Sequence, residues 1–285
     1  NVPHAIAVSN GTVALDIALK TIGIKTGDEV IIPAMTYFAT ASAVNYQNAI
    51  PVFVDSGTAD LSMDPEHARA LVSEKTRAIM PVDPLGQPAD HLSLERLAKE
   101  VGVHVVVDAA CALGASRASQ RCGSHGDMGC FSFHPRKVVT CGEGGMVTTG
   151  DPVLANQLRL LRNHGARKTS TRAFEFVETG FNYRLSEIPA AMGISQMRRI
   201  DEIVSDRRMT AARYDSEVSS LPGVQILNPP ADACWSYQSY VVLFDESIDR
   251  DEVMSRMNQE GIETTVGTYA CHQQPAFSKW GYRPG

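Results

Sequence analysis

Short apolar runs alternate with helix-like segments over the first 108 residues, and this alternation restricts the fold more than any other feature of the sequence. Strands are expected at 30–32, 51–54, 78–82 and 103–107, and helices at 14–22, 37–46, from 65 onward and at 92–101. Asp64 and Pro65, for example, form the N-cap and first-turn pair that opens a helix. An α/β fold with a mainly parallel central sheet covered by helices is therefore predicted.

The pattern changes after Gly150. Helices are expected at 151–163, over most of 185–220 and at 250–259, with strand-like segments at 235–244 and 263–269. The last of these elements form a small α+β group. A chain of 285 residues suffices for roughly two domains. We therefore expect a large domain at 1–205 and a smaller C-terminal α+β domain at 206–285.

Charge and hydropathy exclude several classes of partner. The formal net charge is −6, whereas binding to nucleic acid or to an anionic membrane usually needs a basic face, so neither partner is expected. The most apolar stretch, at 30–44, is interrupted by Pro33, Thr36 and Ser42 and is too short to cross a bilayer. The N-terminal residues show no basic region followed by a long apolar core, so no secretory signal is visible and a cytoplasmic protein is expected.

The six cysteines show no Cys-x-x-Cys spacing. They are interpreted as reduced, mostly packed thiols rather than as a zinc site or a disulfide framework. Cys122 and His125 are close enough in sequence to suggest a pair of metal ligands. Because no second pair lies nearby in the sequence, no metal site is predicted.

The segment CFSFHPRKVVTCGEGGMV, at 130–147, places Lys137 behind a strand-like run that also carries Ser132. A lysine amine is a nucleophile only when it is deprotonated, and burial or condensation with an aldehyde overcomes its usual pKa of about 10.4. Gly144 and Gly145 would allow a flat ligand to approach the backbone. A surface lysine in a turn between two strands is the simpler interpretation, but the neighbouring serine and glycines favour a reactive lysine.

This segment resembles the DegT/DnrJ/EryC1/StrS family of sugar aminotransferases when it is taken with three others: VSNGTVAL at 8–15, VVVDAACALGA at 105–115 and GFNYRLSEIPAAMG at 180–193. Four motifs in the right order are far more specific than one, and the likeness also extends between them. The resemblance implies the fold-type I scaffold of aspartate aminotransferase. It also implies the cofactor pyridoxal 5'-phosphate (PLP), with Lys137 as the residue that binds PLP covalently.

The resemblance assigns further residues to the phosphate and the ring of the cofactor. Gly11 and Thr12 lie at the turn into a helix, where free N–H groups suit a phosphate, although the motif alone is better explained as an ordinary helix cap. Ser132 is implied as a second phosphate contact through its hydroxyl. Tyr37 lies at the position where the family has an aromatic ring that stacks on the cofactor. Phe38 beside it is the alternative for this role.

Asp108 ends the run VVVD and is expected at the carboxyl end of a parallel strand, where open α/β sheets bind their ligands. A carboxylate there can keep a pyridine nitrogen protonated, so that the ring accepts electrons when a proton is removed. An N-cap for a following helix is the alternative. Cys111 departs from the family, which usually has glutamine or histidine beside the phenolic oxygen of the cofactor. A thiol is a weak hydrogen-bond donor, which puts that contact in doubt.

Asn182, in GFNYR, matches the asparagine that reaches the cofactor phosphate of a neighbouring subunit in this family. A homodimer with shared active sites is therefore expected, although a buried turn asparagine explains the motif equally well. His272 is a candidate contact to substrate, and a surface histidine explains it equally well. His134 lies between Ser132 and Lys137 but is left out of the site, because the family often has His-Pro there without such a role.

The predicted activity is transfer of an amino group from glutamate or glutamine to the keto group of a nucleotide-linked deoxysugar. Lys137 and Asp108 are the predicted catalytic residues, and Lys137 is expected to move a proton between the amino-acid Cα and the cofactor. Two alternatives remain: a related PLP-dependent sugar dehydratase, in which histidine replaces the lysine, and a catalytically silent sensor or scaffold. Compared with the family, the sequence is expected to lack an N-terminal segment and the end of the small domain.

Overall fold

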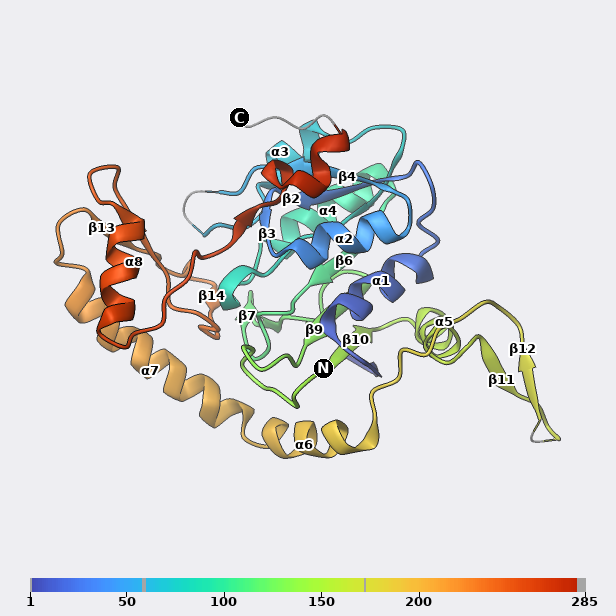
Figure 1. The fold of residues 1–285 in the computed structure, drawn as a ribbon. Coiled ribbons are helices and arrows are strands. Elements are labelled where there is room, and N and C mark those ends of the chain that lie inside the picture. Colours follow the sequence, from blue (N-terminus) through green and yellow to red (C-terminus); the bar gives the residue numbers. More distant parts are fainter. Residues whose placement is uncertain (1, 58–59, 172, 281–285) are drawn as a thin grey trace.

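A seven-stranded sheet, in the order β1-β10-β9-β6-β5-β2-β4, forms the centre of the computed structural model, which describes residues 2–57, 60–171 and 173–280. Five strands, from β9 to β4 in this order, are parallel to one another, and β10 and β1 extend one edge as antiparallel strands. The strands are β1 (His4–Val8), β2 (Glu29–Pro33), β4 (Ile50–Val54), β5 (Thr76–Ile79), β6 (His104–Asp108), β9 (Met128–Ser132) and β10 (Gly145–Thr149). The predicted mainly parallel α/β sheet is confirmed (Figure 1).

Helices cover both faces of this sheet, and the alternation of side chains along each strand explains why. Val30 and Ile32 of β2 pack into a core with helices α1, α2 and α5, whereas Ile31 between them packs into a second core with α3 and α4. Both faces of each central strand are therefore apolar, which is typical of parallel sheets. The helices are α1 (Gly11–Thr21), α2 (Phe38–Tyr46), α3 (Pro65–Ala70), α4 (His91–Val101) and α5 (Pro152–Arg162).

Side-chain caps fix where several of these helices begin. Asp64 accepts hydrogen bonds from the amides of Glu66 and His67, with Pro65 in the first turn of α3, as the sequence predicts. Asn10 caps α1 in the same way by accepting from the amide of Val13 at 2.9 Å. The start of α1 is thereby fixed beside the ends of β9 and β10.

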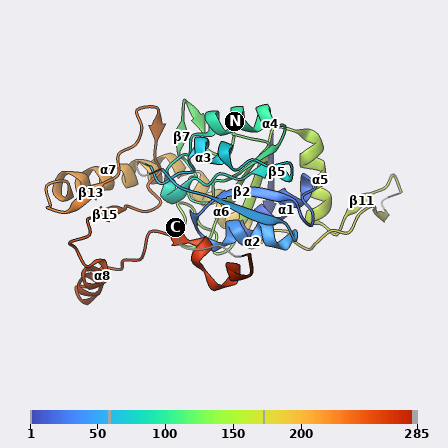
Figure 2. The ribbon, with the colours of Figure 1, turned by 90° about the horizontal axis from the view of Figure 1, so that it is seen from above.

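The chain after α5 leaves the sheet. A hairpin of β11 (Ala166–Lys168) and β12 (Phe174–Phe176) projects from the body in both views (Figures 1 and 2). Helices α6 (Glu187–Met197) and α7 (Ile200–Val218) then form an arc below the sheet in Figure 1. Beyond α7, the chain forms the antiparallel pair β13 (Val224–Ile226) and β15 (Val242–Phe244) and then helix α8 (Arg250–Gln259). The α7 helix runs through residues 205 and 206, so the predicted domain boundary falls inside a single helix.

The strand predicted at 263–269 is wrong, because a strand needs a partner and only its last residue has one. Strand β16 (Tyr269–Ala270) pairs with β3 (Met35–Thr36), which belongs to the large unit. The short 3₁₀ helices η2 (Cys271–Gln273) and η3 (Pro275–Trp280) follow, and the buried ring of Phe277 packs at 5.3 Å from Phe38 and 5.5 Å from Phe53, measured between ring centroids. The predicted boundary assigns residues 269–277 to the small C-terminal domain, but these residues pack against the large domain.

Short elements complete the description. Strand β14 (Ala233–Cys234) pairs with β7 (Ser116–Arg117), which pairs in turn with β8 (Gln120–Arg121), and the 3₁₀ helix η1 (Pro84–Gly86) follows β5. All six cysteines are free, and four of them are buried. Within the described parts of the chain, every helix is too short or too polar to span a bilayer.

Candidate active site

Asp108 lies at the carboxyl end of β6, as predicted, and its side chain is buried. The hydroxyl of Thr40 donates to one carboxylate oxygen at 2.8 Å, and the amide of Ala110 donates to the other at 3.1 Å. Burial raises the pKa of Asp108, while the Thr40 bond, the positive charge of Lys137 and the Ala110 amide partly offset that effect. Both carboxylate oxygens are thus held in a fixed orientation.

Lys137 reaches the same region from the turn after β9. Its Nζ donates to the Sγ of Cys111 at 3.0 Å, and Cys111 follows Asp108 by three residues. The position that departs from the family thus accepts a hydrogen bond from the lysine, a role that a thiol sulfur can fill weakly. Lys137, Asp108 and Cys111 are brought together, although 26 residues separate the lysine from the cysteine.

The start of α1 packs tightly against the end of β9. A Cβ atom at Gly11 would lie 2.6 Å from the Cβ of Ser132, so a larger residue at position 11 would push the helix away from the strand. The amides of Gly11 and Thr12 belong to the first turn of α1 and have no acceptor within the helix. They and the Ser132 side chain therefore lie in one region where hydrogen-bond donors and the positive end of a helix dipole meet.

Tyr37 and Phe38 have different environments, which separates the two aromatic candidates. Phe38 packs on the buried ring of Phe277. Tyr37 is the N-cap residue of α2, and its side chain is 68% exposed. It lies next to Thr36, whose hydroxyl is 2.8 Å from that of Thr40. Tyr37 is thus the more accessible of the two rings, because Phe38 is only 37% exposed and packs on Phe277.

Asn182 is exposed, so the alternative of a buried turn asparagine is wrong. Its backbone bridges to Asn163, and the neighbouring Tyr183 donates its hydroxyl to Asp16 of α1 at 3.1 Å. The two histidines lie in separate surroundings. His134 is exposed and 3.9 Å from Glu143, whereas the Nδ1 of His272 is buried without a partner among the described residues.

Several contacts of this site were missed from the sequence. Thr36 and Thr40 stand four residues apart around Tyr37, and this spacing on one face of a helix start is the signal that could have shown them. Gln238 donates to the carbonyl of Arg136, beside Lys137, at 3.0 Å. Ser236 donates to the carbonyl of Cys111 at 3.4 Å. No local pattern predicts these last two contacts, which join segments 102 and 125 residues apart.

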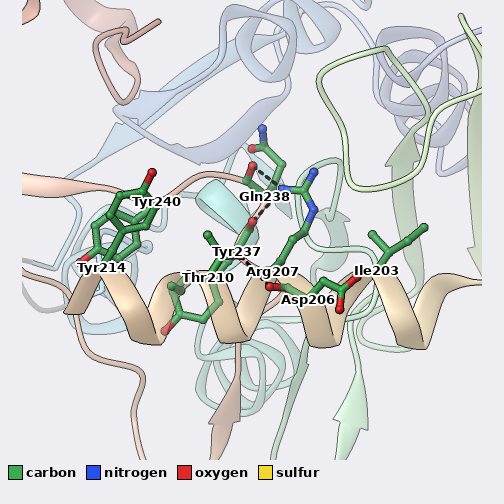
Figure 3. Close-up of a pocket in the computed structure, with 9 residues that line it drawn as sticks. Ile203, Asp206, Arg207, Thr210, Tyr214, Tyr237, Gln238 and Tyr240 are labelled. Carbon is green, nitrogen blue, oxygen red and sulfur yellow. Dashed lines mark hydrogen bonds between the residues drawn. The ribbon is translucent and has the colours of Figure 1, made fainter. Parts of the chain in front are cut away.

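A cavity of about 400 Å³ lies along α7, next to this region (Figure 3). Arg207 crosses it and donates to the carbonyls of Tyr237 at 3.0 Å and Gln238 at 3.2 Å. The rings of Tyr214 and Tyr240 stack at one end, with centroids 4.9 Å apart. Because Gln238 also contacts the Lys137 turn, one wall of the cavity is shared with the candidate site.

The fold and the site define a class. The sheet is mainly parallel, and it places a buried aspartate at the end of β6 and a lysine after β9. The start of helix α1 faces a serine of β9. Fold-type I PLP-dependent transferases share this arrangement. The model of the DegT/DnrJ/EryC1/StrS aminotransferase family matches residues 1–284. The chain belongs to this family of aminotransferases.

Individual relatives agree with this assignment. The GDP-perosamine synthase of Caulobacter vibrioides is 38% identical over 281 residues, which is 97% of this chain and 75% of that protein. The structure of DesV from S. venezuelae is 36% identical, has a TM-score of 0.92 and is matched by all of this chain over 75% of its own length. The PLP form of the putative sugar aminotransferase Spr1654 from Streptococcus pneumoniae is 26% identical, with a TM-score of 0.92. The match covers 99% of this chain and 77% of that one. The predicted fold type, enzyme class and PLP cofactor are confirmed, and the chain spans about three quarters of the length of these relatives.

Proposed function

We propose that this aminotransferase moves an amino group from glutamate or glutamine to the keto group of a nucleotide-linked deoxysugar. The observation that carries the proposal is the placement of the Lys137 amine 3.0 Å from Cys111 and within the electrostatic reach of the buried Asp108. Relatives named GDP-perosamine synthase support a nucleotide sugar as substrate. The dehydratase alternative requires histidine at position 137, and the silent-scaffold alternative is not favoured by the aminotransferase relatives.

The residues present fit PLP. The first-turn amides of α1 lie beside Ser132 and would donate to the phosphate, and Thr12 would add a hydroxyl there. Asp108 would pair with the ring nitrogen, Tyr37 would cover a face of the ring, and Lys137 would bind the aldehyde carbon. When bound, PLP supplies an electron sink for the negative charge that forms at the carbon losing a proton.

The side chains of the chain then have separate tasks. The Lys137 amine would take the proton from the amino-acid Cα as a general base and deliver it, as a general acid, to the carbon that was the aldehyde of the cofactor. The buried Asp108 carboxylate supplies a negative charge in surroundings where water screens it little. Thr40 fixes the direction of that carboxylate through its 2.8 Å bond. Cys111 accepts from the Lys137 amine and holds it on the side of Asp108.

We also propose that two copies of the chain form a homodimer with shared sites. Helix α6 has no buried residue among those described, and it exposes Ile188, Met192 and Ile194. Phe174 and Phe176 of the hairpin are exposed as well. Apolar surface of this extent supports a protein interface. Asn182, directly before α6, would reach the neighbouring site, and a two-fold axis would repeat that contact.

The proposal is tested with purified protein, PLP and each amino donor. Glutamate or glutamine should change the absorbance of the bound cofactor and release the corresponding 2-oxo acid in one turnover. A panel of nucleotide-linked keto-sugars, analysed by mass spectrometry, should then identify an aminated product. An unchanged spectrum with both donors, from protein that binds PLP, would favour the scaffold alternative.

A further inference from the structure

A second group of chemically active side chains lies outside the candidate active site, on the sheet face covered by α3 and α4. It consists of Asp83 before η1, His91 at the start of α4 and Cys122 after β8. One ligand atom from each of the three residues lies within 4.8 Å of the others. All three are buried, with 0%, 2% and 7% of their surfaces exposed. Three distant segments thus place oxygen, nitrogen and sulfur atoms around one point.

Two polar atoms of this group, Asp83 Oδ2 and His91 Nδ1, are buried without a hydrogen bond to any described residue. Asp83 Oδ1 is satisfied, because it accepts from the amide of Ala89 at 2.9 Å. It also lies 2.9 Å from His91 Nε2 and pairs with that ring. A buried carboxylate oxygen without a donor is costly. A cation bound at this point would remove that cost.

We propose that Asp83, His91 and Cys122 bind a divalent zinc-class cation. Thiolate, imidazole and carboxylate together are ligands that zinc prefers, and three protein ligands leave one position for water. The thiol of Cys122 would release its proton to solvent on binding, and His91 would bind as the neutral imidazole. One thiolate and one carboxylate would then balance the two positive charges of the ion.

His125 and Glu95 would position the ring of His91 rather than bind the ion. The His125 ring stacks on that of His91, with centroids 4.3 Å apart and planes at 19°. The Nδ1 of His125 lies 3.4 Å from the Glu95 carboxylate. Of the two residues that the sequence suggested as metal ligands, Cys122 would bind the ion and His125 would support the ring of His91. The other two ligands, Asp83 and His91, were not suggested by the sequence.

One edge of the group lies beside the protein surface. His91 and His125 line a small surface pocket together with Arg117 and Asp232. Arg117 and Arg121 both carry charges that oppose a cation here. Arg121, next to Cys122, lies 3.4 Å from Asp201. Arg117 is paired with Asp232 at 3.3 Å and with Asp60 at 3.9 Å. Its charge is thus largely balanced before an ion enters.

The proposed metal site adjoins the active site without being part of it. The amide of Asp83 donates to the carbonyl of Asp108 at 2.9 Å. A bound ion would hold the chain after β5 against the end of β6. It would also offset the negative charge of Asp83, which is one of the contributions that raise the pKa of Asp108.

The test measures metal binding by the full chain, with PLP and without it. After equilibration with zinc and removal of free metal, elemental analysis should find about one zinc per chain. Cys122→Ser should bind zinc more weakly by roughly tenfold or more. Cys271→Ser is the matched control, because Cys271 is equally buried but lies on the other face of the sheet. Cobalt should give a thiolate-to-metal absorption band in the wild type and in Cys271→Ser but not in Cys122→Ser.

X-ray absorption of the zinc-loaded wild type gives a second result that does not depend on a variant folding. A sulfur neighbour at about 2.3 Å and nitrogen or oxygen neighbours at about 2.0–2.2 Å are expected. Absence of zinc binding, absence of the sulfur neighbour, or unchanged binding by a folded Cys122→Ser would overturn the proposal. None of these readouts requires transamination, so they are independent of the proposed substrate.

Discussion

Lys137 and the carboxylate opposite it are the residues on which the proposed chemistry depends. Lys137→Ala should lower transamination by more than the roughly 10² to 10⁴ fold that general acid–base catalysis contributes, because the covalent attachment of PLP is lost as well. Borohydride reduction followed by peptide mass spectrometry should find PLP attached to Lys137 in the wild type and to no peptide in the variant. Arg136→Ala removes a neighbouring exposed cation and is the control. A PLP–peptide adduct in the Lys137→Ala protein would contradict the assignment.

A substitution at Thr40 tests how the surroundings of Asp108 set its pKa. The Thr40 hydroxyl lowers a carboxyl pKa that burial raises, so Thr40→Val should raise the pKa of Asp108 further. If Asp108 acts as a carboxylate, the acid side of the pH profile for donor deamination should move to higher pH. Rapid-mixing kinetics across a pH series would measure this shift. Thr149→Val is the control, because Thr149 is also buried and donates its hydroxyl to the Asp127 carbonyl. This substitution should leave the pH profile unchanged. A profile that does not move in Thr40→Val would remove Thr40 from this role.

The residues of the site differ in how far the sequence predicts them. Asp108 is predictable because it ends an apolar run, and the ends of parallel strands meet at one edge of the sheet. Thr40 has a local signal in its spacing from Thr36, whereas Gln238 and the Asp83 group become visible only when distant segments are folded together. Conventional spacing rules search for ligand pairs a few residues apart, whereas all of α4 and β6 lie between Asp83 and Cys122 in the sequence.

Among the elements, the link between α1 and the chain before α6 is open to test. Tyr183 donates to Asp16, and burial together with the Asp16 charge raises the pKa of Tyr183 to about 12. The phenol therefore contributes stability that is complete below its unfolded pKa of about 10 and is lost as the pH rises through the folded value. Tyr183→Phe should lower the free energy of unfolding by about 1 kcal/mol at neutral pH.

Urea unfolding at neutral pH and in the alkaline range would measure both effects of Tyr183→Phe. The difference between wild type and variant should shrink as the pH rises from about 10 to 12. Tyr269→Phe, at an exposed tyrosine that does not contribute to the pKa of Tyr183, is the comparison. A difference that grows with alkalinity would mean that the phenol does not act as the donor.

Elements with local signals are predicted well and elements without them are not. The Asp64 cap and the strand at 30–32 depend on neighbours in sequence, and both are confirmed. The segment at 263–269 has strand-like residues but no backbone partner along most of its length, so composition alone misled the prediction. The tight contact between Gly11 and Ser132 depends on how α1 and β9 pack, which no local pattern contains.

For the whole assembly, shared sites make a strong prediction. In a mixed dimer of Lys137→Ala and Asn182→Ala chains, one site would carry both changes and the other neither. Loss of the Asn182 bond should cost on the order of 1.5–3 kcal/mol of cofactor affinity. Refolding the two variants together at limiting PLP should therefore restore activity above that of either alone. Demonstrated subunit exchange without recovered activity would show that Asn182 does not serve its neighbour.

The pairing of β16 with β3 has a mechanical consequence for the unit built from α7, β13, β15 and α8. The polypeptide leaves the large unit through α7 and returns to it at Tyr269, so this unit is an excursion fastened at both ends, like the handle of a bucket. It is also held in the middle, where β14 pairs with β7, so it can neither swing away as a body on a single tether would nor tilt freely about the line joining its two ends. A single backbone cut in the exposed segment 228–232 should consequently leave two pieces that still migrate together under native conditions.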